Sequence, residues 1–155
     1  MRDVVIVDSV RTGLTKAFRG SFNLTRSDDM LAHCIDSLLD RNPNVGADEV
    51  EDVVVGAATH AGEQDGNIAR LAVVLSKLPI TAAGVSINRF CSSGLQAIAI
   101  AANQIASGQT EVAIAGGVDS ISMRTRQEPG KANQNQRLIE AVSYTHLRAH
   151  ETDIN

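Results

Sequence analysis

The sequence has 155 residues, with 43% hydrophobic and 21% charged side chains, a formal net charge of −4 and a pI near 5.5. This composition indicates one globular domain and excludes the basic surface that nucleic-acid binding requires. Aromatic residues make up only 3% and tryptophan is absent, so Ala, Val, Ile and Leu have to build the core, which favours parallel sheet packed by helices.

Cysteine usage and the amino-terminal residues favour a cytoplasmic protein. Cys34 and Cys91 lie far apart, without a CxxC motif or histidine at ligand spacing, so we expect neither a disulfide framework nor a zinc site. Free thiols fit a reducing compartment. The residues at the amino terminus lack a long apolar signal segment, and no stretch reaches the apolar length of a membrane span.

The first quarter of the chain predicts a strand, a basic loop and a helix. The β-branched run at residues 3–10 is typical of a strand buried on both faces. Ser27 is expected to cap an amphipathic helix, with Cys34 in its packing stripe as a structural residue and His33 on its flank. The loop between them carries four cations that could attract phosphates, although a solvated loop is the commoner explanation: Arg11, Lys16, Arg19 and Arg26.

A second strand is expected at residues 52–58, after turn residues and a short acidic turn. A Gly-rich loop and a helix from about residue 67 to 77 follow it. His60 lies just past the strand end, where open α/β sheets place ligands, so it is a candidate base on location alone. A loop histidine without a partner is more often structural or solvated.

The stretch SINRFCSSGLQAIAIA, residues 86–101, places Cys91 where a strand over 84–90 meets a helix over 92–107. Helix N–H groups and the positive end of the helix dipole favour the thiolate, which is the reactive form of cysteine. The same N–H groups can stabilise an oxyanion during acyl transfer. The alternative interpretation is a buried structural cysteine, since free cysteine is among the most buried residue types.

Small and polar residues around this joint support a tight connection. Ser92 or Ser93 can satisfy free N–H groups of the first helical turn, and Gly94 permits close approach of a backbone or substrate. The helix is apolar nearly all round, which predicts that it is buried, and Gly108 should end it. A last strand with two further glycines follows, and the alternation of strands and helices predicts a mostly parallel sheet with right-handed crossovers.

The segment NRFCSSGLQA, residues 88–97, resembles the nucleophile motif of the thiolases. Two other stretches are similar to the same family. Asn67, Ala69 and Arg70 match the region before the nucleophile strand, and GGVDSISM, residues 116–123, matches the region after the nucleophile helix. Many members have Glu in place of Asp119 in the latter. The resemblance covers residues 1–123, and we expect this part to be a truncated thiolase amino-terminal domain.

The resemblance implies an α/β fold with a mostly parallel (mixed) sheet and helices on both faces, as the incomplete amino-terminal half of a thiolase-like fold. It implies a degradative 3-ketoacyl-CoA thiolase of fatty acid β-oxidation, acting on acyl-CoA and coenzyme A through an acyl-Cys91 intermediate, without a cofactor or metal. Thiolases carry the activating histidine and a second cysteine in a later domain, and neither Cys34 nor His60 matches their motifs. We therefore expect an inactive fragment of a full-length homo-oligomer.

Two other functions stay open. One is a condensing enzyme of the ketoacyl synthase class, which would be labelled by acyl carrier protein thioesters instead of CoA thioesters. The other is a chain that acts only as an assembly partner, because losing part of a sheet exposes apolar faces that mark partners or aggregation.

The apolar pattern ends at Arg124. Residues 124–141 form an uncertain connection, and residues 142–155 are expected to be an artefactual tail, because VSYTHLRAHET resembles one reading frame of a transposase adapter used for sequencing libraries. His146 and His150 have the i, i+4 spacing of a helical metal pair, but no third ligand is evident, so the tail is the preferred interpretation.

Overall fold

A parallel sheet of three strands forms the centre of the computed structural model, which describes residues 2–124 and Arg137. The strands, in the spatial order β2-β1-β3, are β1 (Asp52–Gly56), β2 (Ala83–Ile87) and β3 (Ala113–Gly117). The middle strand β1 pairs in parallel with both neighbours, and its residues Val53, Val54 and Val55 are buried. The predicted α/β class and the parallel sheet are confirmed.

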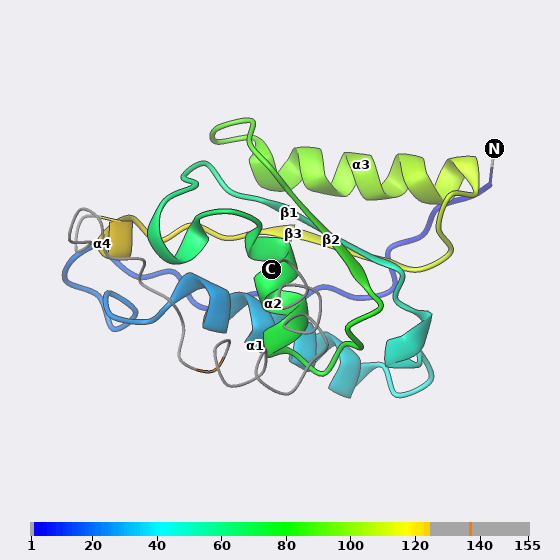
Figure 1. The fold of residues 1–155 in the computed structure, drawn as a ribbon, viewed down its shortest axis with the longest axis horizontal. Coiled ribbons are helices and arrows are strands. Elements are labelled where there is room, and N and C mark those ends of the chain that lie inside the picture. Colours follow the sequence, from blue (N-terminus) through cyan, green and yellow to red (C-terminus); the bar gives the residue numbers. More distant parts are fainter. Residues whose placement is uncertain (1, 125–136, 138–155) are drawn as a thin grey trace, which may run out of the picture.

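Helices cover both faces of this sheet (Figure 1). The longer helices are α1 (Ser27–Arg41), α2 (Ile68–Leu75) and α3 (Ser93–Ser107), and the short ones are η1 (Ala47–Glu49), η2 (Gly62–Gln64) and α4 (Ile121–Arg124). α1 and α2 lie together on one face, and α3 lies on the other. The larger core cluster includes Ile35 and Ile68, and a smaller one joins Val54 to Ala97 of α3.

Local sequence signals set several helix boundaries. Asn67 caps α2, because its side-chain oxygen accepts a hydrogen bond from the Arg70 N–H at 3.1 Å. The amide nitrogen of Asn67 also donates to the Gly84 carbonyl at 2.7 Å, so one side chain joins α2 to β2. Gly108 ends α3 in the left-handed conformation with φ 77°. The end of α3 at Gly108 was predicted, whereas the cap at Asn67 was not, and α2 ends at Leu75 instead of near residue 77.

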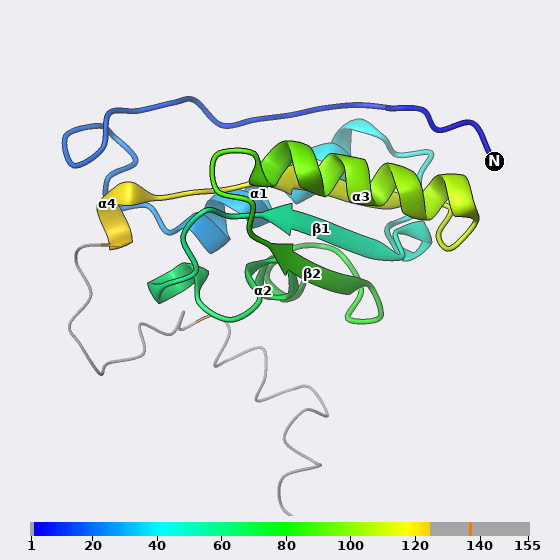
Figure 2. The same cartoon turned by 90° about the horizontal axis from the view of Figure 1, so that it is seen from above.

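The predicted strand at residues 3–10 is wrong. Within the described part of the chain this segment pairs with no strand, and Val5, Ile6 and Val7 are 73–80% exposed. Figure 2 shows it running outside the sheet, past α3. A groove of about 550 Å³, lined by residues 10–15, α1 and β3, lies beside it. β-branched side chains favour extended backbone, but a strand also needs a neighbour whose N–H and C=O groups are free.

The expectation that α3 is buried on all sides is also wrong. Ala97 and Ala101 pack on the sheet, whereas Leu95 is 71% and Ile98 is 43% exposed. An apolar composition predicts burial of the whole helix, but the described residues cover only one of its faces. No helix among the described residues is long and apolar enough to cross a membrane.

Candidate active site

A sharp elbow, residues 88–92, connects β2 to α3 at the carboxyl end of the parallel sheet. Cys91 lies in this elbow as a free and exposed thiol. Phe90, just before it, has φ 50°, in the left-handed region that bulky residues seldom adopt, and the residue is 77% exposed. The strand therefore ends three residues earlier than predicted and the helix begins one residue later. Ligands of open parallel sheets bind at this end of the strands.

Ser93 fastens the elbow to the start of α3. Its hydroxyl accepts a hydrogen bond from the Arg89 N–H at 2.8 Å and donates one to the Phe90 carbonyl at 2.6 Å. Ser92 is the cap residue of α3 but makes no side-chain capping bond. Neither serine side chain satisfies the first helical turn as expected, and the Ser93 hydroxyl instead joins the Arg89 N–H to the Phe90 carbonyl.

Glycines at the strand ends let α3 lie directly on the sheet. A Cβ atom at Gly56 would come within 2.2 Å of the carbonyl carbon of Ser93, and one at Gly117 within 3.1 Å of the Gly94 Cα. Nothing lies within 4 Å of such an atom at Gly116. The close approach predicted for the glycine pair is confirmed only at Gly117. The tightest one, at Gly56, was missed, although a glycine at a strand end signals it.

His60, the candidate base predicted from location, lies in the loop after β1. Its Nε2 atom is 2.9 Å from the carbonyl oxygen of Ala57. In the described part of the chain, residues 2–124, His60 and Cys91 are not joined by a hydrogen bond. The structure therefore brings both residues to the carboxyl end of the sheet without pairing them. This is the arrangement expected of a structural or solvated histidine.

Asp119 and Gln64 hold the same loop against the end of β3. One carboxylate oxygen of Asp119 accepts a hydrogen bond from the Ala58 N–H at 2.9 Å, and the other accepts from the Gln64 side chain at 3.2 Å. Gln64 is buried, and it also donates to the Thr59 carbonyl at 2.6 Å and accepts from the Ser120 N–H at 2.7 Å. Sequence reasoning missed Gln64, because an isolated buried amide leaves no periodic signal.

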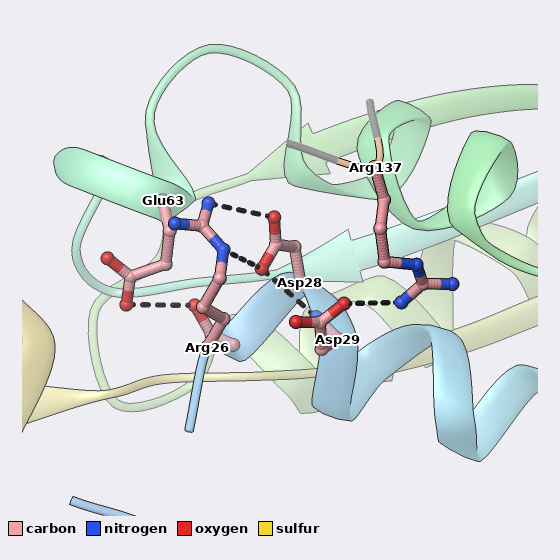
Figure 3. A network of polar contacts seen from close by, with 6 residues as sticks. Arg26, Asp28, Asp29, Glu63 and Arg137 are labelled. Carbon is pink, nitrogen blue, oxygen red and sulfur yellow. Dashed lines mark hydrogen bonds and ion pairs between the residues drawn. The ribbon is translucent and has the colours of Figure 1, made fainter. Parts of the chain in front are cut away.

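Four basic residues of the amino-terminal loop were candidates for phosphate contacts, and one of them is engaged within the chain. Arg26 donates from two nitrogens to both carboxylate oxygens of the buried Asp28, at 3.0 Å each (Figure 3). This bidentate geometry is the strong form of an ion pair. Arg11, Lys16 and Arg19 are exposed. A phosphate contact by these three stays a prediction.

Ser27 is the first residue of α1 and not its cap, which corrects the prediction. Its buried hydroxyl lies 3.3 Å from a carboxylate oxygen of Glu63, which is also buried. At the outer side of the same helix end, Arg137 donates to Asp29 at 2.6 Å (Figure 3). The amino-terminal end of α1 is therefore a polar cluster that ties η2 and residue 137 to the helix.

Cys34 lies on α1, half-buried, and lines the groove described above. Burial raises the pKa of the Cys34 thiol above its ordinary value, and a hydrogen bond from the Thr12 backbone opposes that shift. A thiol that stays protonated is a poor nucleophile. This environment agrees with the structural role predicted for Cys34.

The predictions for the carboxyl-terminal part lie outside the described residues. These are the connection at 124–141, apart from Arg124 and Arg137, the artefactual tail at 142–155, and the histidine pair at 146 and 150. Within residues 2–124 and 137, no group of three His, Cys, Asp or Glu side chains could hold a metal ion.

The fold and the elbow define an α/β protein that presents a free thiol at the carboxyl end of a parallel sheet, before the first turn of a helix. Comparison with known families assigns the chain to one of them. The family described as "Thiolase, N-terminal domain" matches residues 4–151. The chain belongs to the thiolase family, and the matching part is its amino-terminal domain.

Curated relatives are bacterial thiolases. The beta-ketoadipyl-CoA thiolase of Pseudomonas putida is 46% identical over 122 residues, 79% of this chain and 30% of that protein. The 3-oxoadipyl-CoA/3-oxo-5,6-dehydrosuberyl-CoA thiolase of Escherichia coli K12 is 42% identical over the same shares. The 3-ketoacyl-CoA thiolase of Aliivibrio salmonicida is 41% identical over 78% of this chain and 31% of that protein. The chain thus spans about 30% of the length of these relatives.

Proposed function

We propose that Cys91 is the acyl-accepting thiol of a thiolase-type acyltransferase. The observation that carries this proposal is the position of Cys91, exposed in the elbow between β2 and α3 of a thiolase amino-terminal domain. The amino-terminal end of a helix favours a thiolate, and its N–H groups can stabilise the oxyanion of a tetrahedral intermediate. Cys34 is half-buried and lacks this placement.

The proposed reaction has two steps. The Cys91 thiolate attacks the 3-keto carbon of a 3-ketoacyl-CoA, and a sulfur–carbon bond forms. The bond between C2 and C3 of the substrate then breaks, and its electron pair passes to C2 of the departing acetyl-CoA, which takes up a proton. The thiol of coenzyme A next attacks the acyl-Cys91 thioester, so that a shortened acyl-CoA leaves and the thiolate is restored. No cofactor takes part in this scheme.

The names of the relatives support a 3-ketoacyl-CoA substrate. The three relatives act, by name, on beta-ketoadipyl-CoA, 3-oxoadipyl-CoA or 3-ketoacyl-CoA. We propose 3-oxoadipyl-CoA as the first substrate class to test, with the fatty 3-ketoacyl-CoA esters of β-oxidation as the second. The difference between them is a terminal carboxylate.

The activating histidine and the second cysteine that the family uses in a later domain have no counterpart among the predicted site residues. We therefore propose that this chain is acylated at Cys91 without repeated turnover. We also propose a cytoplasmic location, which its two free cysteines support, and a homo-oligomeric full-length form, which the exposed Leu95 and Ile98 support.

Acylation of the 155-residue chain by an acyl-CoA, followed by intact-mass and peptide analysis, tests the proposal. Cys91 should take up one acyl group several times faster than the same residue in the chain unfolded by guanidinium. Cys91→Ala should abolish the modification, and the matched variant Cys34→Ala should keep it. Equal labelling of the folded and unfolded chains, or labelling that survives Cys91→Ala, would contradict the assignment. Cys91-dependent turnover of 3-ketoacyl-CoA by this chain would refute the absence of turnover.

A further inference from the structure

Asn88, the first residue of the elbow, bridges two segments that are far apart in the sequence. Its side-chain nitrogen donates to the Ala58 carbonyl in the loop after β1 at 3.0 Å. Its side-chain oxygen accepts from the Phe90 N–H at 2.8 Å. The amide therefore ties the residue next to Cys91 to a loop about thirty positions earlier in the chain.

The elbow needs such a restraint. Phe90 has φ 50°, which is sterically unfavourable for a residue with a Cβ atom, and it persists only where the surroundings hold it. Phe90 is 77% exposed, so packing contributes little to that conformation. Asn88 binds the N–H of Phe90 and Ser93 binds its carbonyl, so hydrogen bonds on both sides hold this conformation.

The acceptor used by Asn88 is itself held in place. The Ala58 N–H donates to Asp119, whose other oxygen accepts from the buried Gln64. Asp119, just after β3, thus holds the N–H of Ala58, while the carbonyl of Ala58 accepts the hydrogen bond from Asn88. The chain of contacts runs from the end of β3, through the loop after β1, to the residue before Cys91.

We propose that Asn88 is a positioning residue for acyl transfer: by joining the Ala58 carbonyl to the Phe90 N–H, it holds Cys91 at the start of α3. This inference rests on the proposed function. Without the bridge, Phe90 leaves the left-handed region, and Cys91 moves away from the helix end. Both ends of the Asn88 amide are engaged by Ala58 and Phe90, so we assign it no contact with substrate. Its loss therefore lowers the rate of acylation and leaves the half-saturating acyl-CoA concentration unchanged.

The test compares Asn88→Ala with Asn103→Ala, which removes the same side chain from an exposed position on α3. Asn88→Ala should lower the maximal acylation rate of Cys91 about tenfold. This is the change expected from losing one hydrogen bond whose net contribution lies at the upper end of the usual range. Asn103→Ala should match the wild type. Asn88→Asp keeps an acceptor for the Phe90 N–H but loses the donor to Ala58, so its rate should lie between the two.

Two readouts need no acyl-CoA and separate this inference from the proposed function. Asn88→Ala should speed hydrogen exchange of the Phe90 amide about tenfold and slow iodoacetamide modification of Cys91, with Cys34 modification as the internal reference. If the wild type is not acylated, the proposed function fails while these two readouts still decide the role of Asn88. Unchanged exchange and alkylation in Asn88→Ala, or an equal change at Cys34, would overturn the positioning role.

Discussion

A Cβ atom added to Gly56 would come within 2.2 Å of the carbonyl carbon of Ser93, so the end of β1 and the start of α3 are in direct backbone contact. Gly56→Ala should push the start of α3 off the sheet. Overpacking of this kind costs about 1–3 kcal/mol in the free energy of unfolding, measured by urea titration. Gly116→Ala, with nothing within 4 Å, is the matched control and should change stability by less than about 0.5 kcal/mol. Equal losses in both variants would contradict the contact.

Much of the fold was predictable because it is encoded locally. The apolar run within residues 52–58 predicts a strand, and the structure has β1 there, with Val54 fully buried. The end of α3 at Gly108 follows from the tolerance of glycine for positive φ. The same reasoning failed for residues 3–10, because strand formation depends on a neighbour that local composition does not encode.

The candidate site was predicted only in part. The joint at Cys91 was evident from a strand pattern that gives way to a helix pattern. Its geometry was not, because it depends on contacts between segments that are distant in the sequence: Asn88 with Ala58, and Gly56 with Ser93. Sequence periodicity predicts neither these contacts nor the left-handed conformation of Phe90.

The exposed amino-terminal segment gives a prediction about stability. Ile6 is 80% exposed and Ile35 is 1% exposed, so the same change to alanine should have unequal effects. Ile35→Ala should lower the free energy of unfolding by about 2–5 kcal/mol, because it leaves a cavity in the core. Ile6→Ala should change it by less than about 0.5 kcal/mol. A large loss from Ile6→Ala in urea titration would show that residues 3–10 are packed in solution.

The ion pair at the start of α1 should matter more than a surface pair. Arg26→Ala leaves Asp28 buried without its arginine, and breaking a buried pair in this way costs about 3–5 kcal/mol in unfolding free energy. Arg2→Ala removes an exposed partner of Glu111 and should cost less than about 1 kcal/mol. Chemical denaturation of both variants measures the difference. Similar small losses would mean that Asp28 is stabilised mainly by its other contacts.

Cys34 gives a prediction about pH. Burial raises its pKa in the folded chain above the ordinary value of 9.0, so the folded state holds this proton more tightly than the unfolded state. The resulting stability is present below about pH 9 and is lost as the pH rises through the folded-state pKa. Cys34→Ala should therefore flatten the alkaline fall in thermal stability, and Cys91→Ala serves as the matched control. The same alkaline fall in the wild type and Cys34→Ala would exclude this contribution.

The strain at Phe90 predicts a substitution that stabilises the chain. A left-handed non-glycine residue costs about 1–3 kcal/mol, and glycine in its place costs about 0.5–1 kcal/mol in backbone entropy. Because the ring is exposed, little packing is lost, and Phe90→Gly should raise the free energy of unfolding by about 1 kcal/mol. Leu95→Gly, at an exposed position inside α3, should lower it by about 1 kcal/mol. Phe90→Ala removes the ring but keeps the Cβ atom, so it separates the effect of the ring from that of the strained backbone. It should leave the free energy of unfolding near that of the wild type. A gain equal to that of Phe90→Gly would assign the effect to the ring and not to the backbone.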